Sequence, residues 1–121
     1  VTLPRRRDLD LARAAQALLD REYRRPPNFA DLAREIGTSQ NKLKSVFKQT
    51  FGLTMADYCL ERRVREAQQL LMEATLTIAQ VAERVGYEHQ SSFAAAFRNQ
   101  VGMSPREYRC HRAPFSLEFP A

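Results

Sequence analysis

The sequence predicts an all-α fold built from two similar halves. The first observation is an internal repeat: residues 29–58 return, with changes, as residues 78–108, and the second copy has one extra residue after its first glycine. The second observation is that both copies contain an amphipathic helix pattern, a glycine, another helix pattern, another glycine and a helix start signal. This order is the signature of a helix-turn-helix, whose second helix fits the major groove of DNA.

Composition limits the class of protein. With 121 residues, of which 44% are hydrophobic, the chain suits one compact domain or two small subdomains. The sequence has no apolar run of about 18 residues and no secretory leader pattern, so we expect no membrane span and a cytoplasmic location. Lysine and arginine outnumber aspartate and glutamate by 19 to 14. This balance suits a polyanionic partner, although many ordinary proteins are equally basic.

The cysteine and histidine residues indicate neither a metal site nor a cofactor, and none is expected. Cys59 and Cys110 are isolated, and His89 and His111 do not complete a cluster with metal-ligand spacing. We expect two reduced thiols. Paired carboxylates, nucleophile–base sets and phosphate loops are not recognisable in the sequence, so an enzyme is the weakest functional interpretation.

Residues 1–8 are predicted to be the end of a linker, because they contain a proline and three arginines and show no apolar period. The first subdomain is predicted over residues 9–53. It is expected to begin with a helix over residues 9–23, and Pro26 and Pro27 follow the end of that helix because they lack the backbone donor. The expected inward face of this helix is Leu11, Ala14, Ala15, Leu18 and Leu19.

Two shorter helices complete the first subdomain. Residues 29–36 are predicted to form a helix with Asn28 as the N-cap and Gly37 as the C-cap. Residues 39–51 are predicted to form the next helix, after which comes Gly52. The expected inward face of this helix is Leu43, Val46, Phe47 and Thr50.

A long linking helix is predicted over residues 54–73. It begins at the capping-box-like sequence Thr54-Met-Ala-Asp57. About 19 helical residues span ~28 Å, which is close to the ~34 Å of one DNA turn. The linking helix is therefore long enough for two recognition helices about one turn apart.

The second subdomain is predicted over residues 74–112 and repeats the plan of the first. Thr77 caps its first helix, the next helix is expected over residues 89–101, and Ser104 starts a short last helix. The tail, residues 113–121, has two prolines and no clear period. The expected inward face of the first helix of this subdomain is Ile78, Val81, Ala82 and Val85.

The helix over residues 39–51 is the first candidate recognition helix. Positions opposite its inward face carry Asn41, Lys44 and Ser45, with Gln40 near the helix start. Asparagine and glutamine can bond adenine with two hydrogen bonds, and lysine can reach O6 and N7 of guanine. Lys48, farther along the helix, is expected to meet phosphate. An ordinary solvated lysine face is the alternative, and the tandem motif favours DNA.

The helix over residues 89–101 is the second candidate recognition helix. Ala94 and Ala95 replace Lys44 and Ser45 of the first copy, and they can pack on thymine methyl groups or let the backbone approach DNA without discriminating bases. We therefore expect more base discrimination from the first helix than from the second. The predicted base-contacting residues of the second helix are His89, Gln90, Ser91, Ser92, Ala94 and Ala95.

Further phosphate contacts are expected at helix starts and from arginines. Thr54 and Ser104 begin helices, whose free backbone N–H groups favour anions. Arg98 and Arg106 are expected to contact phosphate as well. Arg109, Arg62 and Arg63 are further candidates, and for the last two an ion pair with Glu66 inside the helix is an equal alternative.

The repeated units, the helix between them and the closing sequence GMSPREYR resemble the AraC/XylS family of bacterial transcription regulators. The resemblance covers about residues 9–112, and its most specific part is IAQVAERVGYEHQSSFAAAFRNQVGMSPREYR, which is similar to the second helix-turn-helix of the family. It implies seven helices, two helix-turn-helix subdomains and recognition helices that enter successive major grooves. The base-contacting positions that it implies are Asn41, Lys44 and Ser45, then Gln90, Ser91, Ala94 and Ala95.

The resemblance also sets expectations about partners. It implies double-stranded promoter DNA as the partner, with RNA polymerase as a second one and no membrane. Most members carry an N-terminal effector or dimerisation domain, so the chain is expected to be the C-terminal part of a longer regulator. Some members have arginine or threonine where this chain has Ala94 and Ala95. The alternative function is a helical protein-interaction module with only non-specific DNA affinity.

Overall fold

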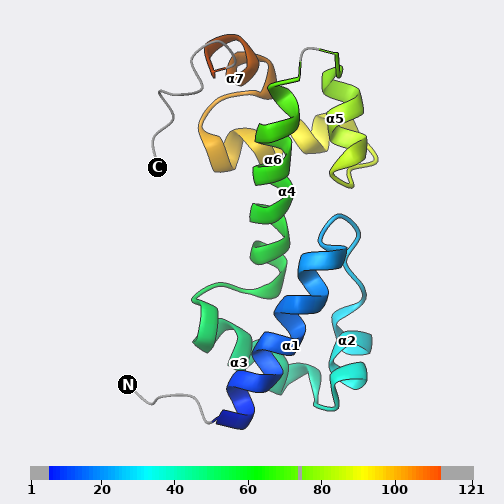
Figure 1. Cartoon of the computed structure of the whole chain (residues 1–121), viewed down its shortest axis with the longest axis vertical. Helices are drawn as coiled ribbons and strands as arrows, with labels where there is room; N and C mark the ends of the chain where they lie inside the picture. The colour runs from blue at the N-terminus through cyan, green and yellow to red at the C-terminus, as the bar shows by residue number, and fades with distance from the viewer. Residues whose placement is uncertain (1–5, 74, 113–121) are drawn as a thin grey trace. The chain divides into compact units, whose positions relative to one another are not determined.

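The computed structural model describes residues 6–73 and 75–112. These residues contain seven α-helices and no strand, which confirms the predicted all-α fold (Figure 1). The chain divides into two compact units, Val1–Leu60 and Glu61–Ala121, and the division falls within α4 (Met55–Leu71). The predicted subdomain limits, including the separate linking helix, stay predictions.

The first unit is built from α1 (Arg6–Glu22), α2 (Phe29–Ile36), α3 (Gln40–Phe51) and the first residues of α4. In this unit α1 packs against both α2 and α3. Apolar side chains from each of these helices form the core. They include Ala12, Ala15, Leu18, Leu19, Leu32, Ala33, Leu43, Val46, Phe47, Met55 and Cys59.

Local capping explains where α2 and α3 begin and end. Asn28 Oδ1 accepts a hydrogen bond of 2.7 Å from the Ala30 N–H, and Ser39 Oγ accepts one of 3.1 Å from the Lys42 N–H. Gly37 ends α2 with φ 95°, in the left-handed region that glycine adopts without a side-chain clash. The predicted bounds of α2 are confirmed, and Ser39 is the cap of α3 rather than its first helical residue.

The first helix differs from its prediction in two respects. It begins at Arg6, so Arg6–Asp8 are helical. Asp8 lies in the first turn, where a carboxylate interacts favourably with the helix dipole. The inward stripe contains Ala12 in place of Ala14, which is exposed. The remaining predicted linker residues and the predicted tail, residues 113–121, lie outside the described residues.

The second unit contains the rest of α4 with α5 (Ile78–Arg84), α6 (Gln90–Val101) and α7 (Pro105–Arg112). Two predicted capping motifs are present. Thr77 and Gln80 exchange hydrogen bonds of 2.8 and 3.0 Å, and Ser104 and Glu107 exchange bonds of 2.9 and 3.1 Å. The buried side chains of this unit include Val64, Ala67, Leu71, Leu76, Val81, Ala82, Val85, Phe93, Phe97 and Tyr108.

Ile78 corrects the predicted inward face of α5, because its side chain is only half-buried. It is the first residue of the helix and lies at the edge of the unit, whereas Val81 and Ala82, one turn later, are buried. Of the two tyrosines that match in the repeat, Tyr108 is a core residue and is 2% exposed. Tyr58 is half-buried, and its hydroxyl donates a hydrogen bond to the Asp20 carboxylate.

The two turns before α3 and α6 differ in length as the repeat predicts. Thr38 and Ser39 separate Gly37 from α3, whereas three residues separate Gly86 from α6. Within the described residues, no helix is long and apolar enough to cross a membrane.

Candidate nucleic-acid interface

The outer face of α3 carries the predicted base-contacting residues of the first unit. Leu43, Val46 and Phe47 anchor α3 in the core. The same helix therefore turns its other side toward solvent. Asn41, Lys44, Ser45 and Lys48 are exposed, and Gln40 is half-buried. The structure thus brings the predicted donors and acceptors together on one accessible surface.

Lys42 is separated from this face by an ion pair. Its Nζ lies 3.4 Å from Asp8 Oδ1 of α1, and the Asp8 side chain is 16% exposed. The pair links α3 to α1 and gives Lys42 a carboxylate counter-charge. The sequence alone does not reveal this pairing, because the two residues lie on different helices.

The outer face of α6 carries shorter and less polar side chains than that of α3, because Ala94 and Ala95 replace Lys44 and Ser45. Phe93 and Phe97 are fully buried and anchor α6, while Arg98 is exposed. Ala94 is half-buried, so it is the least accessible of the predicted base-contacting residues in this unit. The exposed members are His89, Gln90, Ser91, Ser92 and Ala95.

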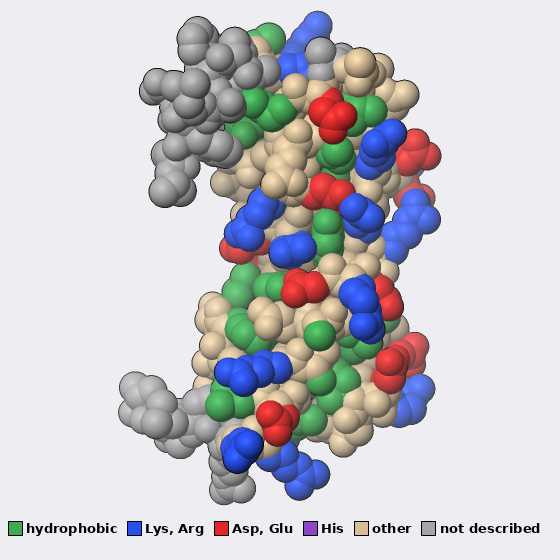
Figure 2. Space-filling model, in the orientation of Figure 1, with side chains coloured by type: hydrophobic (Ala, Val, Ile, Leu, Met, Phe, Trp, Pro, Cys, Tyr) green, Lys and Arg blue, Asp and Glu red, His purple; other side chains and the backbone are tan. Residues whose placement is uncertain are grey.

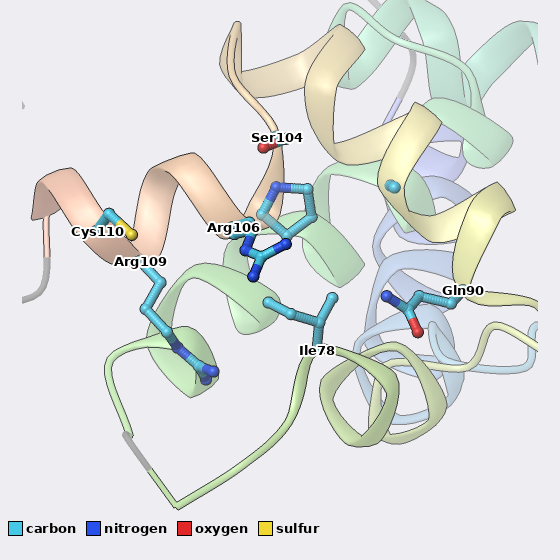
Figure 3. A pocket seen from close by; sticks show the side chains of 8 residues that line it. Ile78, Gln90, Ser104, Arg106, Arg109 and Cys110 are labelled. Atoms are coloured by element: carbon cyan, nitrogen blue, oxygen red, sulfur yellow. The ribbon is translucent and has the colours of Figure 1, made fainter.

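A groove of about 450 Å³ lies between α6 and the first turns of α5 and α7 (Figure 3). Its surface is largely apolar, with Ile78, Ala94 and Pro105 in the lining. The polar residues that line it include Gln90, Ser104, Arg106 and Arg109. The groove therefore joins residues predicted to contact bases with two predicted to contact phosphate, Ser104 and Arg106.

Ser104 stands at the start of α7, where the capping box changes the local charge. Its backbone N–H donates to the Glu107 carboxylate, and its hydroxyl accepts from the Glu107 N–H. Hydrogen bonding from the Ser104 backbone, and then from its side chain, lowers the pKa of Glu107 from 4.5. Glu107 is thus an anion at neutral pH next to the site where Ser104 was predicted to favour phosphate.

The start of α4 is the equivalent position in the first copy of the repeat, and Thr54 is exposed there, whereas Ser104 is half-buried. Thr54 Oγ1 accepts a hydrogen bond of 3.0 Å from the Asp57 N–H. Thr54 and Ser104 are equivalent in the repeat, and it is Ser104 whose backbone N–H donates the return bond to an acidic side chain. The phosphate contact predicted at Thr54 faces less competition from a carboxylate than the one predicted at Ser104.

Arg109 has a structural role that the sequence did not reveal. Its Nε donates to Leu71 O at 2.9 Å, and its Nη2 donates to Glu73 O at 3.1 Å. In Figure 3 its side chain extends from α7 toward the end of α4. Because these bonds satisfy carbonyls at the C-terminus of α4, Arg109 is not a free phosphate-binding group.

Charge alone does not mark the interface. In the view of Figure 2, basic and acidic side chains are interspersed over both units. Among the described residues there is no group of three or more histidine, cysteine or acidic side chains that could hold a metal ion. Cys59 is buried, Cys110 is exposed, and both are free thiols.

The comparisons with known proteins assign the family. Residues 32–111 match the family model described as a helix-turn-helix domain. A crystal structure of an AraC-type DNA-binding domain-containing transcriptional regulator from Chromobacterium violaceum covers 90% of this chain and 97% of that chain, with a TM-score of 0.77 and 29% identity. This chain belongs to the AraC-type helix-turn-helix family. Membership confirms the resemblance stated from the sequence.

Two further matches are with proteins named as transcription regulators. The probable transcriptional regulator LumQ of Photobacterium leiognathi is 33% identical over 91 residues, which are 75% of this chain and 37% of LumQ. The DNA-binding domain of AdpA, a global transcriptional factor, was solved in complex with a target DNA and matches with a TM-score of 0.74 and 26% identity, over 88% of this chain and 96% of that one. The chain spans about a third of the length of the curated relatives that it matches.

Proposed function

We propose that the chain binds double-stranded promoter DNA in a sequence-specific manner, as part of a bacterial transcription regulator, with α3 and α6 in successive major grooves. The observation that carries the proposal is the pair of recognition helices, each anchored by buried phenylalanine and each exposing polar side chains on its outer face. Family membership supports the same function, because the matched relatives are named as transcriptional regulators.

The α3 face is suited to base discrimination. Asn41 can form two hydrogen bonds with adenine, and Lys44 can donate to O6 and N7 of guanine. Lys48 lies one turn beyond Lys44 on the exposed surface, where a phosphate contact fixes the register of the helix without sequence information. We propose Gln40 and Ser45 as additional base contacts at this face.

The α6 face is suited to affinity with weaker discrimination. Gln90 and Ser91 can contact base edges, while Ala95 can pack on a thymine methyl group. The groove beside α6 offers an apolar surface for deoxyribose and the Arg106 guanidinium for phosphate. Arg98 adds a second exposed positive charge to this helix.

The wider setting is also part of the proposal. We infer that the chain functions in the bacterial cytoplasm, that it contributes binding rather than catalysis, and that RNA polymerase is a further partner. A longer regulator with an N-terminal effector or dimerisation domain is compatible with relatives about three times as long as the matched segment.

The first experiment is selection of bound sites from random duplex DNA, followed by footprinting and affinity measurement over a range of salt concentrations. We expect one selected motif and a slope of log affinity against log salt of about −0.9 for each phosphate neutralised, from roughly six to ten contacts. Lys48→Ala should weaken binding to all duplexes alike and reduce this slope by about one. No selected motif together with a slope near zero would favour a protein-interaction module instead.

A further inference from the structure

Tyr87 lies in the turn between α5 and α6 and contacts three helices of the second unit. Its backbone N–H donates to Ala82 O of α5 at 3.0 Å. Its ring centroid lies 5.7 Å from that of Phe93 in α6, at an interplanar angle of 57°. From α4, the Cζ atom of Arg63 lies 5.0 Å from the same ring centroid. The ring therefore connects the turn to α6 and α4, and the backbone connects it to α5.

The guanidinium of Arg63 lies over the ring of Tyr87. Its Nε atom is buried and has no hydrogen-bond partner among the described residues. A guanidinium over an aromatic ring is attracted by the ring quadrupole, most strongly where water is excluded. A buried donor without a partner carries a desolvation cost, so the stacking contact has to offset that cost.

The first turn of α6 lacks the device that fixes the first turn of α3. In α3, Ser39 Oγ accepts a hydrogen bond from the Lys42 N–H. The equivalent N-cap of α6 is His89, whose side chain makes no capping bond. The turn before α6 is also one residue longer, which gives the chain more freedom at this point. Tyr87 lies in this longer turn, so its contacts restrict the chain directly before α6.

We propose that Arg63 and Tyr87 are positioning residues for the second recognition helix. The stack holds the turn, and with it the first turn of α6, in the orientation that presents Gln90 and Ser91 to DNA. Neither Arg63 nor Tyr87 contacts DNA in this proposal, which replaces the phosphate contact considered for Arg63 from the sequence. The inference rests on the proposed DNA binding and adds how one of the two helices is oriented for it.

The test compares two disruptive variants, Arg63→Gln and Tyr87→Leu, with their conservative counterparts, Arg63→Lys and Tyr87→Phe. Each protein is measured by fluorescence anisotropy on the full selected duplex and on a duplex that retains only the half contacted by α3. The ratio of the two affinities reports the contribution of the second unit. Amide hydrogen exchange of the free protein reports the order of the first turn of α6. All measurements are made well below the unfolding temperature, with helix content checked by circular dichroism.

We expect the disruptive variants to lower the affinity ratio roughly tenfold, a change expected when a desolvated stacking contact is lost. They should also speed exchange at Tyr87 and Phe93, whose N–H groups donate to Ala82 O and His89 O, and leave affinity for the α3 half-site unchanged. The conservative variants should stay within about threefold of the original protein, because they retain the cation or the ring.

Other outcomes overturn the inference in distinct ways. A lower ratio with unchanged exchange would mean that Arg63 acts directly on DNA. Faster exchange with an unchanged affinity ratio would mean that the stack stabilises the fold but does not affect DNA binding. Equal losses of affinity in the conservative and disruptive variants would mean that the attraction between the cation and the ring is not the cause. If the original protein selects no DNA motif, the proposed function fails, whereas the exchange data still decide whether Arg63 and Tyr87 order α6.

Discussion

Helices α3 and α6 are equivalent in the repeat, but they are held in place by different interactions. The start of α3 is fixed by the Ser39 cap, and Lys42 in the same turn forms an ion pair with Asp8 of α1. The start of α6 has no side-chain cap and is contacted instead by the aromatic ring of Tyr87. The two copies of the repeat therefore differ in what contacts the first turn of the recognition helix, a capping hydroxyl in one and an aromatic ring in the other.

The exposed faces of the two helices also differ, because that of α6 is less polar. Lys44 and Ser45 of α3 correspond to Ala94 and Ala95 of α6, so the second helix has fewer hydrogen-bonding groups for bases. Ala94 is half-buried beside the groove, which reduces its access further. We therefore propose that the first unit contributes more base discrimination and the second more affinity, and mutations can test this difference.

The largest expected effect concerns the matched core residues Phe47 and Phe97, both fully buried. Phe47 packs with Phe51 and Tyr58, and Phe97 packs with Phe93 and Tyr108. Substitution of either phenylalanine by alanine should lower the free energy of unfolding by about 3–5 kcal/mol, because it removes apolar contacts and leaves a cavity. Urea denaturation measures this loss.

Hydrogen exchange of the same two variants tests whether the units open separately. Phe47→Ala should speed exchange mainly in α1–α3, and Phe97→Ala mainly in α5–α7. Exchange that rises equally in both units for both variants would contradict the comparison, because the two cores would then form one cooperative unit.

The next effect is on base discrimination. Asn41→Ala and Lys44→Ala should each relax preference at one defined base pair at a cost of about 1–3 kcal/mol, whereas Ser91→Ala should cost less. Anisotropy with base-substituted duplexes measures each cost. We expect the selected motif to have one sharp half under Asn41 and one degenerate half, about one turn of roughly 10 base pairs away. Two equally sharp halves, or a sharp half under Gln90, would reverse the assignment of roles.

A smaller effect is expected at the two N-caps. Ser39→Ala should destabilise the first unit by about 1 kcal/mol, because the Lys42 N–H loses its acceptor. His89→Ala is the matched control and should have little effect, since His89 makes no capping bond. His89→Ser should stabilise the second unit, as residue 89 already has the extended backbone of a capping residue, with φ −121° and ψ 131°. Thermal unfolding of the three variants checks these values, and equal losses for Ser39→Ala and His89→Ala would show that the caps are equivalent after all.

The smallest effect concerns the pH dependence of the α7 start. Because the pKa of Glu107 is lowered in the folded state, its hydrogen bonds with Ser104 stabilise the fold above the ordinary pKa of 4.5. This contribution is lost as the pH falls through the lowered folded value. Glu107→Gln should therefore be less stable than the original protein at pH 7, and the difference should shrink toward pH 3. Asp57→Asn is the matched variant at the start of α4, and unfolding temperatures measured across this range decide whether the effect belongs to Glu107.

The helices, most of their limits and the repeat could be predicted from the sequence, because they depend on interactions between residues three or four positions apart. The caps at Asn28, Thr54, Thr77 and Ser104 are local in this sense, and so is the inward face of α3. The exposed polar face of α3 follows directly, since the residues opposite a buried stripe must face solvent. The base and phosphate contacts assigned to these faces stay predictions.

The tertiary structure alone decided which residues distant in the chain meet. Arg109 caps the carbonyls of α4 from a position 38 residues away, and Lys42 pairs with a carboxylate on α1. The Arg63–Tyr87 stack and the partial burial of Ala94 also depend on how helices pack within the second unit. Helical periodicity states which face of a helix is buried, but not which residue of another helix lies opposite. For that reason the sequence identified two recognition helices, and only the packing showed that they are held differently.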